Sequence, residues 1–123
     1  MSKPRSRLVG KADHEFCTVK GFTTVIHFGK QAKHLPGQPN YDPSRSTITI
    51  GIQKLQDLVE RKAGTGAWFS SGHEVVDFGV SIGIFHDRPT GLDHPTTRGT
   101  IHYSKTGAHV VPADPRTPLR KGR

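Results

Sequence analysis

One segment of the chain has hydrophobic residues at helical spacing. Between residues 52 and 63, apolar side chains fall three or four positions apart, with charged and amide side chains between them. Gly64 follows at the position where glycine commonly ends a helix. The pattern predicts one main α-helix over residues 52–63 that covers a sheet. Its apolar side comprises Ile52, Leu55, Leu58, Val59 and Ala63.

Strand-like patterns surround this helix. Residues 22–28 are rich in β-branched and aromatic side chains, and residues 74–86 alternate as one long bent strand or two short ones. Residues 98–104 and 108–111 flank a glycine-containing turn, which predicts a hairpin. Strands outnumber helices. We therefore expect an α+β domain, with an antiparallel sheet of about four to five strands and one main helix packed on one face.

The first strand of the hairpin has a polar face. Thr100, His102 and Ser104 occupy alternate positions, so their side chains share one face, while the intervening Ile101 and Tyr103 point toward the core. A titratable imidazole on a polar strand face is typical of a functional site as well as of a structural hairpin. This face is therefore a candidate site.

The turn decides whether the return strand adds His109 to this face. A two-residue loop at residues 106–107 would pair Ser104 with His109 and gather the polar side chains in one cluster. A three-residue loop at residues 105–107, with the glycine in the left-handed conformation, would send His109 to the opposite face. The sequence leaves both registers open.

Positive charge is concentrated at the two ends of the chain. The 123 residues carry a net charge of +8, but residues 1–11 and 116–123 together hold eight basic residues and no acidic one. The remainder is formally neutral. We expect a basic, partly disordered arm over residues 1–20, a folded domain over residues 21–115 and a basic tail over residues 116–123. Such arms can bind a phosphate backbone without sequence preference.

Several classes of protein do not fit the composition. Cys17 is the sole cysteine, so neither an intramolecular disulfide nor a cysteine-based zinc site can form, which suits a reducing compartment. No apolar stretch has the length of a membrane span or a signal peptide core. The histidines lack the spacing of a zinc-binding helix. We expect no metal, no cofactor and no membrane partner.

An ordered succession of motifs runs from about residue 30 to residue 115. The segments that carry it are Lys30–Gly37, Tyr41, Arg45–Ser46, Glu74, Val76–Gly79, Thr97, Ile101–Ser104, Gly107, His109 and Val111–Pro112. This succession resembles the bacterial toxin 50 domain, also called polymorphic toxin type 50. Similar segments end some phage head morphogenesis proteins.

The resemblance implies a ribonuclease-like toxin of the broad group that includes barnase and the RelE-type nucleases. It also implies a fold in which one or two helices pack on an antiparallel sheet whose open face bears the active site. The expected activity is metal-independent cleavage of RNA through attack of the 2′-hydroxyl, which leaves a 2′,3′-cyclic phosphate. RNA is the expected substrate.

This reaction needs a base for the 2′-hydroxyl, an acid for the leaving oxygen and cations for the phosphate. Histidine suits both proton transfers because its ordinary pKa is about 6.5. We expect His102 and His34 to form the acid/base pair and Lys30 to stabilise phosphate charge. For His109, orientation of the hairpin is preferred over catalysis. The residues expected to contact substrate are Thr100, Ser104, Lys105, His109, Arg45 and Lys33.

Two other functions are compatible with the sequence. An ADP-ribosyltransferase toxin would use an arginine, a pair such as Ser46–Thr47 and a later glutamate, but no suitable glutamate follows Glu74. On a strand, Glu74 and Asp77 lie on opposite faces, and Glu74 is expected to face solvent or bind a loop. The second alternative is a non-catalytic RNA-binding or phage capsid-associated module that uses the basic arms.

A toxin of this class implies further partners. An acidic immunity protein is expected to cover the polar face, because its charge would complement the histidines, lysines and arginines there. The expected site of action is the cytoplasm, after delivery or secretion as part of a larger protein.

Overall fold

The computed structural model describes residues 18–38, 41, 45–70 and 72–116. Most of the two basic ends, for which the sequence predicts an arm and a tail, lies outside these residues. The elements, in chain order, are β1 (Thr18–Val19), β2 (Phe22–Thr23), α1 (Phe28–Gln31), the 3-10 helix η2 (Ala32–His34), β3 (Thr47–Ile48), α2 (Ile52–Lys62), β4 (Ala67–Ser70), β5 (His73–Asp77), β6 (Gly83–Asp87), β7 (Leu92–Thr96), β8 (Arg98–Ser104) and β9 (Gly107–Pro112).

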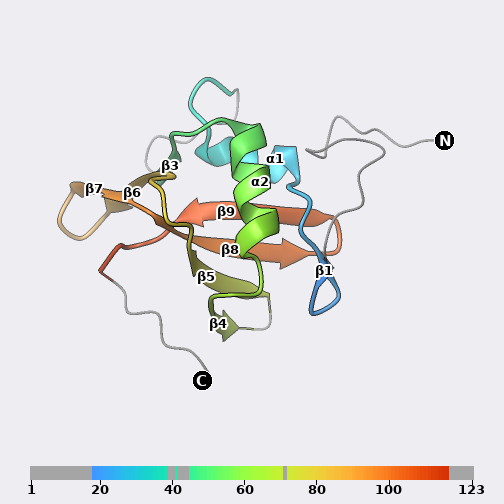
Figure 1. Cartoon of the computed structure of the whole chain (residues 1–123). Coiled ribbons are helices and arrows are strands. Elements are labelled where there is room, and N and C mark those ends of the chain that lie inside the picture. Colours follow the sequence, from blue (N-terminus) through green and yellow to red (C-terminus); the bar gives the residue numbers. More distant parts are fainter. Residues whose placement is uncertain (1–17, 39–40, 42–44, 71, 117–123) are drawn as a thin grey trace.

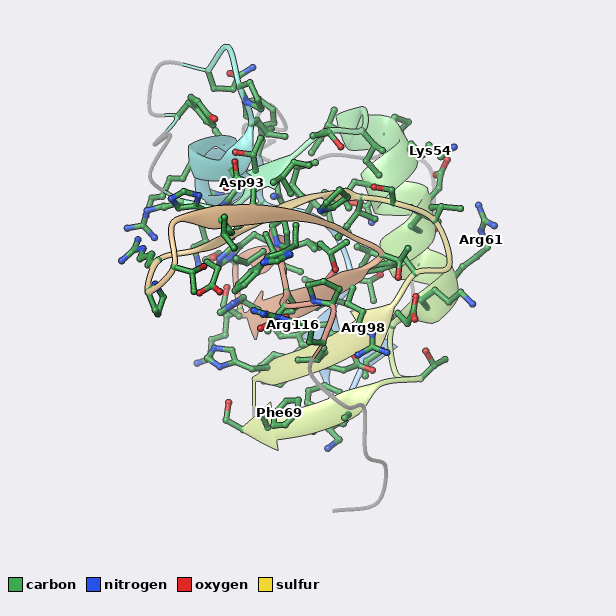
Figure 2. All side chains as sticks on the ribbon, turned by 90° about the vertical axis from the view of Figure 1, so that its left-hand side faces the viewer. Lys54, Arg61, Phe69, Asp93, Arg98 and Arg116 are labelled. Atoms are coloured by element: carbon green, nitrogen blue, oxygen red, sulfur yellow. The ribbon has the colours of Figure 1, made fainter. Side chains whose placement is uncertain are left out.

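The domain is α+β, as expected, and α2 forms where the periodicity predicts it. The helix α2 has an exposed side, which includes Lys54 and Arg61 and points away from the strands (Figure 2). Its apolar side faces the sheet formed by β4, β5, β8 and β9 (Figure 1). Side chains from both layers share one buried core: Leu55, Leu58 and Val59 from α2, with Val76, Ile101, Tyr103, Ala108 and Val110 from the strands.

Among the described residues, the strands form three small antiparallel sheets, whereas the sequence predicted one. Their orders are β4-β5-β8-β9, β3-β6-β7 and β1-β2. The stretch at residues 74–86 is divided because Gly79 adopts a positive φ of 81°. Its N–H donates to Asp77 Oδ1 at 2.9 Å, which closes a turn after β5. As a result β5 pairs with β8, whereas β6 pairs with β3 and β7.

The predicted strand over residues 22–28 is only partly correct. Phe22–Thr23 pairs with β1, but Phe28 already begins α1. The change of structure occurs at His27, whose Nδ1 accepts a hydrogen bond from the N–H of Lys30 at 3.2 Å. A side-chain acceptor at this position satisfies a backbone donor in the first turn of the helix. Lys30 therefore lies on a short helix.

Two features fix α1 and η2 beside β9. The side-chain amide of Gln31 donates to Val110 O at 2.8 Å and accepts from Val110 N at 2.7 Å. A Cβ added at Gly107 would lie 2.9 Å from His27 Cβ and 3.0 Å from Val25 O, so only glycine allows the chain to approach this closely. The sequence between Lys30 and His34 is thereby held against the hairpin.

Candidate functional site

Four histidines form a continuous row across the domain. His73 on β5 pairs with His102 on β8, and His102 pairs with His109 on β9. His34 at the end of η2 extends this row beyond β9. Successive ring centroids from His34 through His109 and His102 to His73 lie 6.3, 4.7 and 4.2 Å apart. We call His34, His109, His102 and His73 the histidine row.

The histidine row lies on the side of the sheet away from α2. Strand side chains alternate, and Ile101 and Val110, the neighbours of His102 and His109, are fully buried in the core that α2 shares. Those two histidines therefore point to the opposite face, where they are half-buried. The polar face predicted for the hairpin exists, and it contains both residues.

The register that joins them differs from both alternatives considered from the sequence. Ser104 pairs with Gly107, so the loop consists of Lys105 and Thr106. Gly107 has the positive φ that the three-residue loop required, at 134°, but it belongs to β9. This pairing places His109 directly opposite His102, which produces the cluster by a route that the sequence did not predict.

The two central histidines are neutral near pH 7. Burial, followed by the nearby His73 and His34, lowers the pKa of His102 to about 4. For His109, burial and then the positive charges around it, including His102 and Lys30, lower the pKa to about 3. The Nδ1 of His109 is buried and has no hydrogen-bond partner within the described part of the chain. Each ring can accept a proton from a bound molecule.

His34 has a defined tautomer. Its side chain is 4% exposed, and its Nδ1 lies 2.8 Å from the carbonyl oxygen of Ser46. Because a carbonyl oxygen can only accept, Nδ1 donates, and in the neutral ring Nε2 carries the lone pair. This is the arrangement of a general base whose second nitrogen is held by the backbone.

Lys30 and Ser104 meet beside the histidine row, as the site hypothesis requires. Lys30 Nζ donates to Ser104 Oγ at 3.0 Å and to Thr106 Oγ1 at 3.1 Å. Ser104 Oγ in turn donates to Gly107 O at 2.8 Å. The α1 helix thus presents an ammonium group to the polar end of the hairpin. A cation and hydroxyl groups at one point are suited to bind phosphate oxygens.

The other residues expected to contact substrate lie around this centre. Thr100 is half-buried and shares a face of β8 with His102. Lys105 is exposed in the hairpin loop, and Lys33 is exposed on η2. Arg45 lies beyond His34, in a cleft. The structure therefore groups Lys30, Ser104 and the histidines closely, and it places the remaining residues at the periphery.

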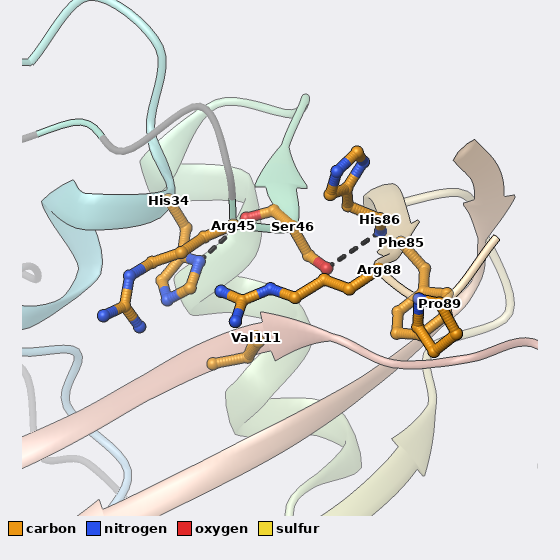
Figure 3. Close-up of a pocket in the computed structure, with 8 residues that line it drawn as sticks. All are labelled: His34, Arg45, Ser46, Phe85, His86, Arg88, Pro89 and Val111. Carbon is orange, nitrogen blue, oxygen red and sulfur yellow. Dashed lines mark hydrogen bonds between the residues drawn. The ribbon is translucent and has the colours of Figure 1, made fainter. Parts of the chain in front are cut away.

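A cleft of about 350 Å³ opens beside His34 and contains residues that the sequence analysis missed (Figure 3). Ser46 Oγ accepts a hydrogen bond from the N–H of His86 at 3.0 Å, which joins β6 to the segment before β3. No local sequence pattern indicated that Phe85, His86 and Arg88 lie near His34, because β6 reaches His34 only through its pairing with β3. We call this the arginine cleft. Its lining residues are His34, Arg45, Ser46, Phe85, His86, Arg88, Pro89 and Val111.

Glu74 has a structural position on the core side of the sheet. It is fully buried, and its carboxylate accepts hydrogen bonds from Gly64 N at 3.0 Å, Gly66 N at 2.7 Å and Tyr103 Oη at 2.7 Å. Burial and this carboxylate raise the pKa of Tyr103 well above its usual value. Glu74 binds a loop, one of its two expected roles, and it does not face solvent.

Within the described part of the chain, no group of three or more histidine, cysteine or acidic side chains is arranged to hold a metal ion. No helix there is both long enough and apolar enough to cross a membrane.

The fold and the site define a small α+β domain with a histidine-lined sheet face and nearby basic side chains. The model of the bacterial toxin 50 family matches residues 26–112, and the chain belongs to this family. The matched region contains the whole histidine row, Lys30 and the arginine cleft. Membership confirms the resemblance found in the sequence and gives the domain a toxin function. Comparison with curated proteins gives no match.

Proposed function

We propose that this toxin domain is a metal-independent endoribonuclease whose active centre is the histidine row with Lys30. The observation that carries the proposal is that His34 of η2 lies beside His109 and His102 on one sheet face, next to the Lys30 ammonium group. Proton acceptors and a cation at one point are the groups that cleavage through the 2′-hydroxyl needs. The family's toxin function supplies the context.

His34 is the proposed base. Its Nδ1 is bound to the backbone of Ser46, so Nε2 is directed by that bond and can take the proton of the 2′-hydroxyl. His102 is the proposed acid. It is neutral in the free protein, but a bound phosphate places negative charge beside the ring and raises its pKa. The protonated ring then donates to the leaving 5′-oxygen.

The spacing of the row suits this division of roles. In-line attack places the attacking and leaving oxygens on opposite sides of phosphorus, so the base and the acid flank the phosphate. His34 and His102 lie on either side of His109, with centroids 6.3 and 4.7 Å from it. Lys30, supported by Ser104, stabilises charge on the phosphorane. The bonds change between the 2′-oxygen, phosphorus and the 5′-oxygen, which yields a 2′,3′-cyclic phosphate and a free 5′-hydroxyl.

Cleavage of total bacterial RNA in excess EDTA tests this proposal. We expect discrete fragments with 2′,3′-cyclic phosphate ends and a rate loss of about 10²- to 10⁴-fold in His102→Ala. Lys54→Ala is the control, because Lys54 is exposed on α2 and projects away from the strands (Figure 2). Circular dichroism would verify the fold of each variant. Equal rates for folded His102→Ala and the parent would refute the assigned role.

The two alternatives predict other results in the same experiments. A transferase would label lysate proteins from labelled NAD without cutting RNA. A binding module would retain RNA with strong salt dependence and release no product. Each outcome would replace the ribonuclease proposal.

The basic rim of the site also suggests how the toxin is neutralised. Lys30, Lys33 and Arg45 lie around the histidine row, so we propose that an acidic immunity protein covers this face. The toxin would act on cytoplasmic RNA after delivery within a larger protein. Protection of the histidine-row amides from hydrogen exchange in a complex would identify the covered face.

A further inference from the structure

The arginine cleft adjoins the proposed active centre, and apart from His34 its lining residues take no part in the proposed proton transfers. His34 belongs to both, and Val111 of the cleft lies on the same face of β9 as His109, two residues further along. A chain that places its scissile phosphate at the histidine row therefore continues directly into the cleft. The volume of about 350 Å³ falls in the usual range for ligand sites, about 300–1,000 Å³.

The polar lining of the cleft is suited to a phosphate group. Arg88 follows β6 and Arg45 precedes β3, and their side chains extend on either side of His34 (Figure 3). Both are exposed, and no carboxylate belongs to the described lining. Guanidinium groups bind phosphate oxygens in a forked geometry that lysine cannot match.

Two acidic side chains of the β6–β7 hairpin are engaged elsewhere. Asp87, which precedes Arg88, accepts from Thr90 Oγ1 at 3.0 Å and from Arg116 at 3.1 Å. Asp93 lies 2.5 Å from Nδ1 of His86. Both carboxylates are therefore directed to partners other than Arg88.

The apolar lining is suited to a base. Phe85, Pro89 and Val111 supply ring and methyl surface next to the two guanidinium groups. The ring of Phe85 is held nearly parallel to that of His94, with centroids 6.4 Å apart and an interplanar angle of 27°. Base-to-aromatic contact of this kind tolerates every base because each has a π-face.

We propose that the arginine cleft binds the nucleotide next to the scissile phosphate, with its phosphate on Arg88 and Arg45 and its base against Phe85 and Pro89. The inference rests on the proposed function, because it requires that an RNA chain bound at the histidine row continues into the cleft. The cleft then sets the register of the chain and binds single-stranded RNA in preference to duplex.

Binding of an uncleavable 2′-O-methyl RNA trinucleotide tests the proposal. We expect about a tenfold weaker Kd in Arg88→Gln and again in Phe85→Ala, from loss of a charged contact and of stacking. Arg61→Gln is the matched control, since Arg61 is an exposed arginine on α2 that projects away from the strands (Figure 2). It should bind like the parent. Arg88 lies exposed outside the core, so this variant keeps its fold even if Phe85→Ala does not.

Cleavage of RNA by the parent, measured in parallel, separates the two claims. Parent-like affinity in Arg88→Gln, or no binding of the trinucleotide by the parent, would overturn the cleft assignment even if RNA is cut. Weaker binding in the cleft variants without cleavage by any protein would support the cleft and refute the ribonuclease.

Discussion

His102 and His109 face each other across the β8–β9 hairpin, with ring centroids 4.7 Å apart and planes within 15° of parallel. Burial is the main cause that lowers the pKa of both rings; His102 lowers the pKa of His109 further, and His73 and His34 lower that of His102. Both rings are therefore neutral near pH 7 in the free protein. A phosphate bound nearby would offset both effects, so substrate itself would complete the protonation state that cleavage requires.

The same pair predicts a loss of stability in mild acid. The pKa values of His102 and His109 are about 4 and 3 in the folded chain and about 6.5 when unfolded, so the unfolded chain binds more protons between these values. Stability is fully present above pH 6.5 and falls as the pH drops toward 4. The rings are partly exposed, so we expect about 1 to 2 kcal/mol per pH unit for the pair.

Urea unfolding at pH values from 7.5 to 5 measures this dependence, above the range where most carboxylates titrate. His34, His73, Lys30 and Lys33 also face the pair and contribute positive charge. A His102→Gln/His109→Gln double variant should have a flatter profile. A parent profile that is already flat over this interval would contradict the prediction.

Lys30→Gln should lower kcat on an RNA oligonucleotide by about 10²- to 10³-fold, because the charge that faces the phosphorane is removed. The hydrogen bonds to Ser104 and Thr106 are partly exposed, so the free energy of unfolding should change by less than about 1 kcal/mol. Lys54→Gln is the control, since Lys54 is an exposed lysine on α2 that projects away from the strands (Figure 2). Similar losses in both variants would indicate a general effect of charge.

Glu74→Gln should destabilise the fold by about 1 to 3 kcal/mol. The carboxylate is buried and accepts from two glycine amides and Tyr103, and an amide group would turn one of these acceptors into a donor. Urea unfolding would compare it with Asp57→Asn, an exposed acidic residue of α2. The folded fraction should still cut RNA. A folded variant without activity would show that Glu74 has a catalytic role.

Gly107→Ala should cost about 2 kcal/mol or more. Its φ of 134° is unfavourable for alanine, and the new Cβ would press against His27 and the backbone of Val25. Gly91→Ala is the matched comparison, because Gly91 also has a positive φ, 73°, but has open space around it. Thermal unfolding should rank Gly107→Ala as the less stable variant. The reverse order would show that His27 and Val25 can move enough to admit the new Cβ.

The sequence predicted the elements that depend on the spacing of apolar residues along a single segment. The spacing of Leu55, Leu58 and Val59 was sufficient for α2, and alternation around Ile101 was sufficient for β8. The break at Gly79 was not predictable in the same way. It depends on which strands β5 and β6 find as partners, and those partners are distant in sequence.

Some residues of the candidate site could likewise be predicted from the sequence, whereas others depend on contacts between distant segments. His102 and Ser104 follow from strand alternation, and Lys30 and His34 were found through the family resemblance. His109 depends on a register that is set by the approach of Gly107 to His27. Arg88 and Phe85 reach His34 only because β6 pairs with β3, so no sequence spacing relates them.

The side chain of Gln31 has a further consequence for the behaviour of the protein in solution. Its amide group binds both the N–H and the carbonyl oxygen of Val110, as the backbone of a neighbouring strand would do at this position of β9. An open strand edge invites other chains to add to it and form aggregates. Here the helix that delivers Lys30 also closes that edge. Release of α1 would therefore remove Lys30 from the site and, at the same time, expose the unpaired edge of β9. Loss of activity and the onset of aggregation should then coincide.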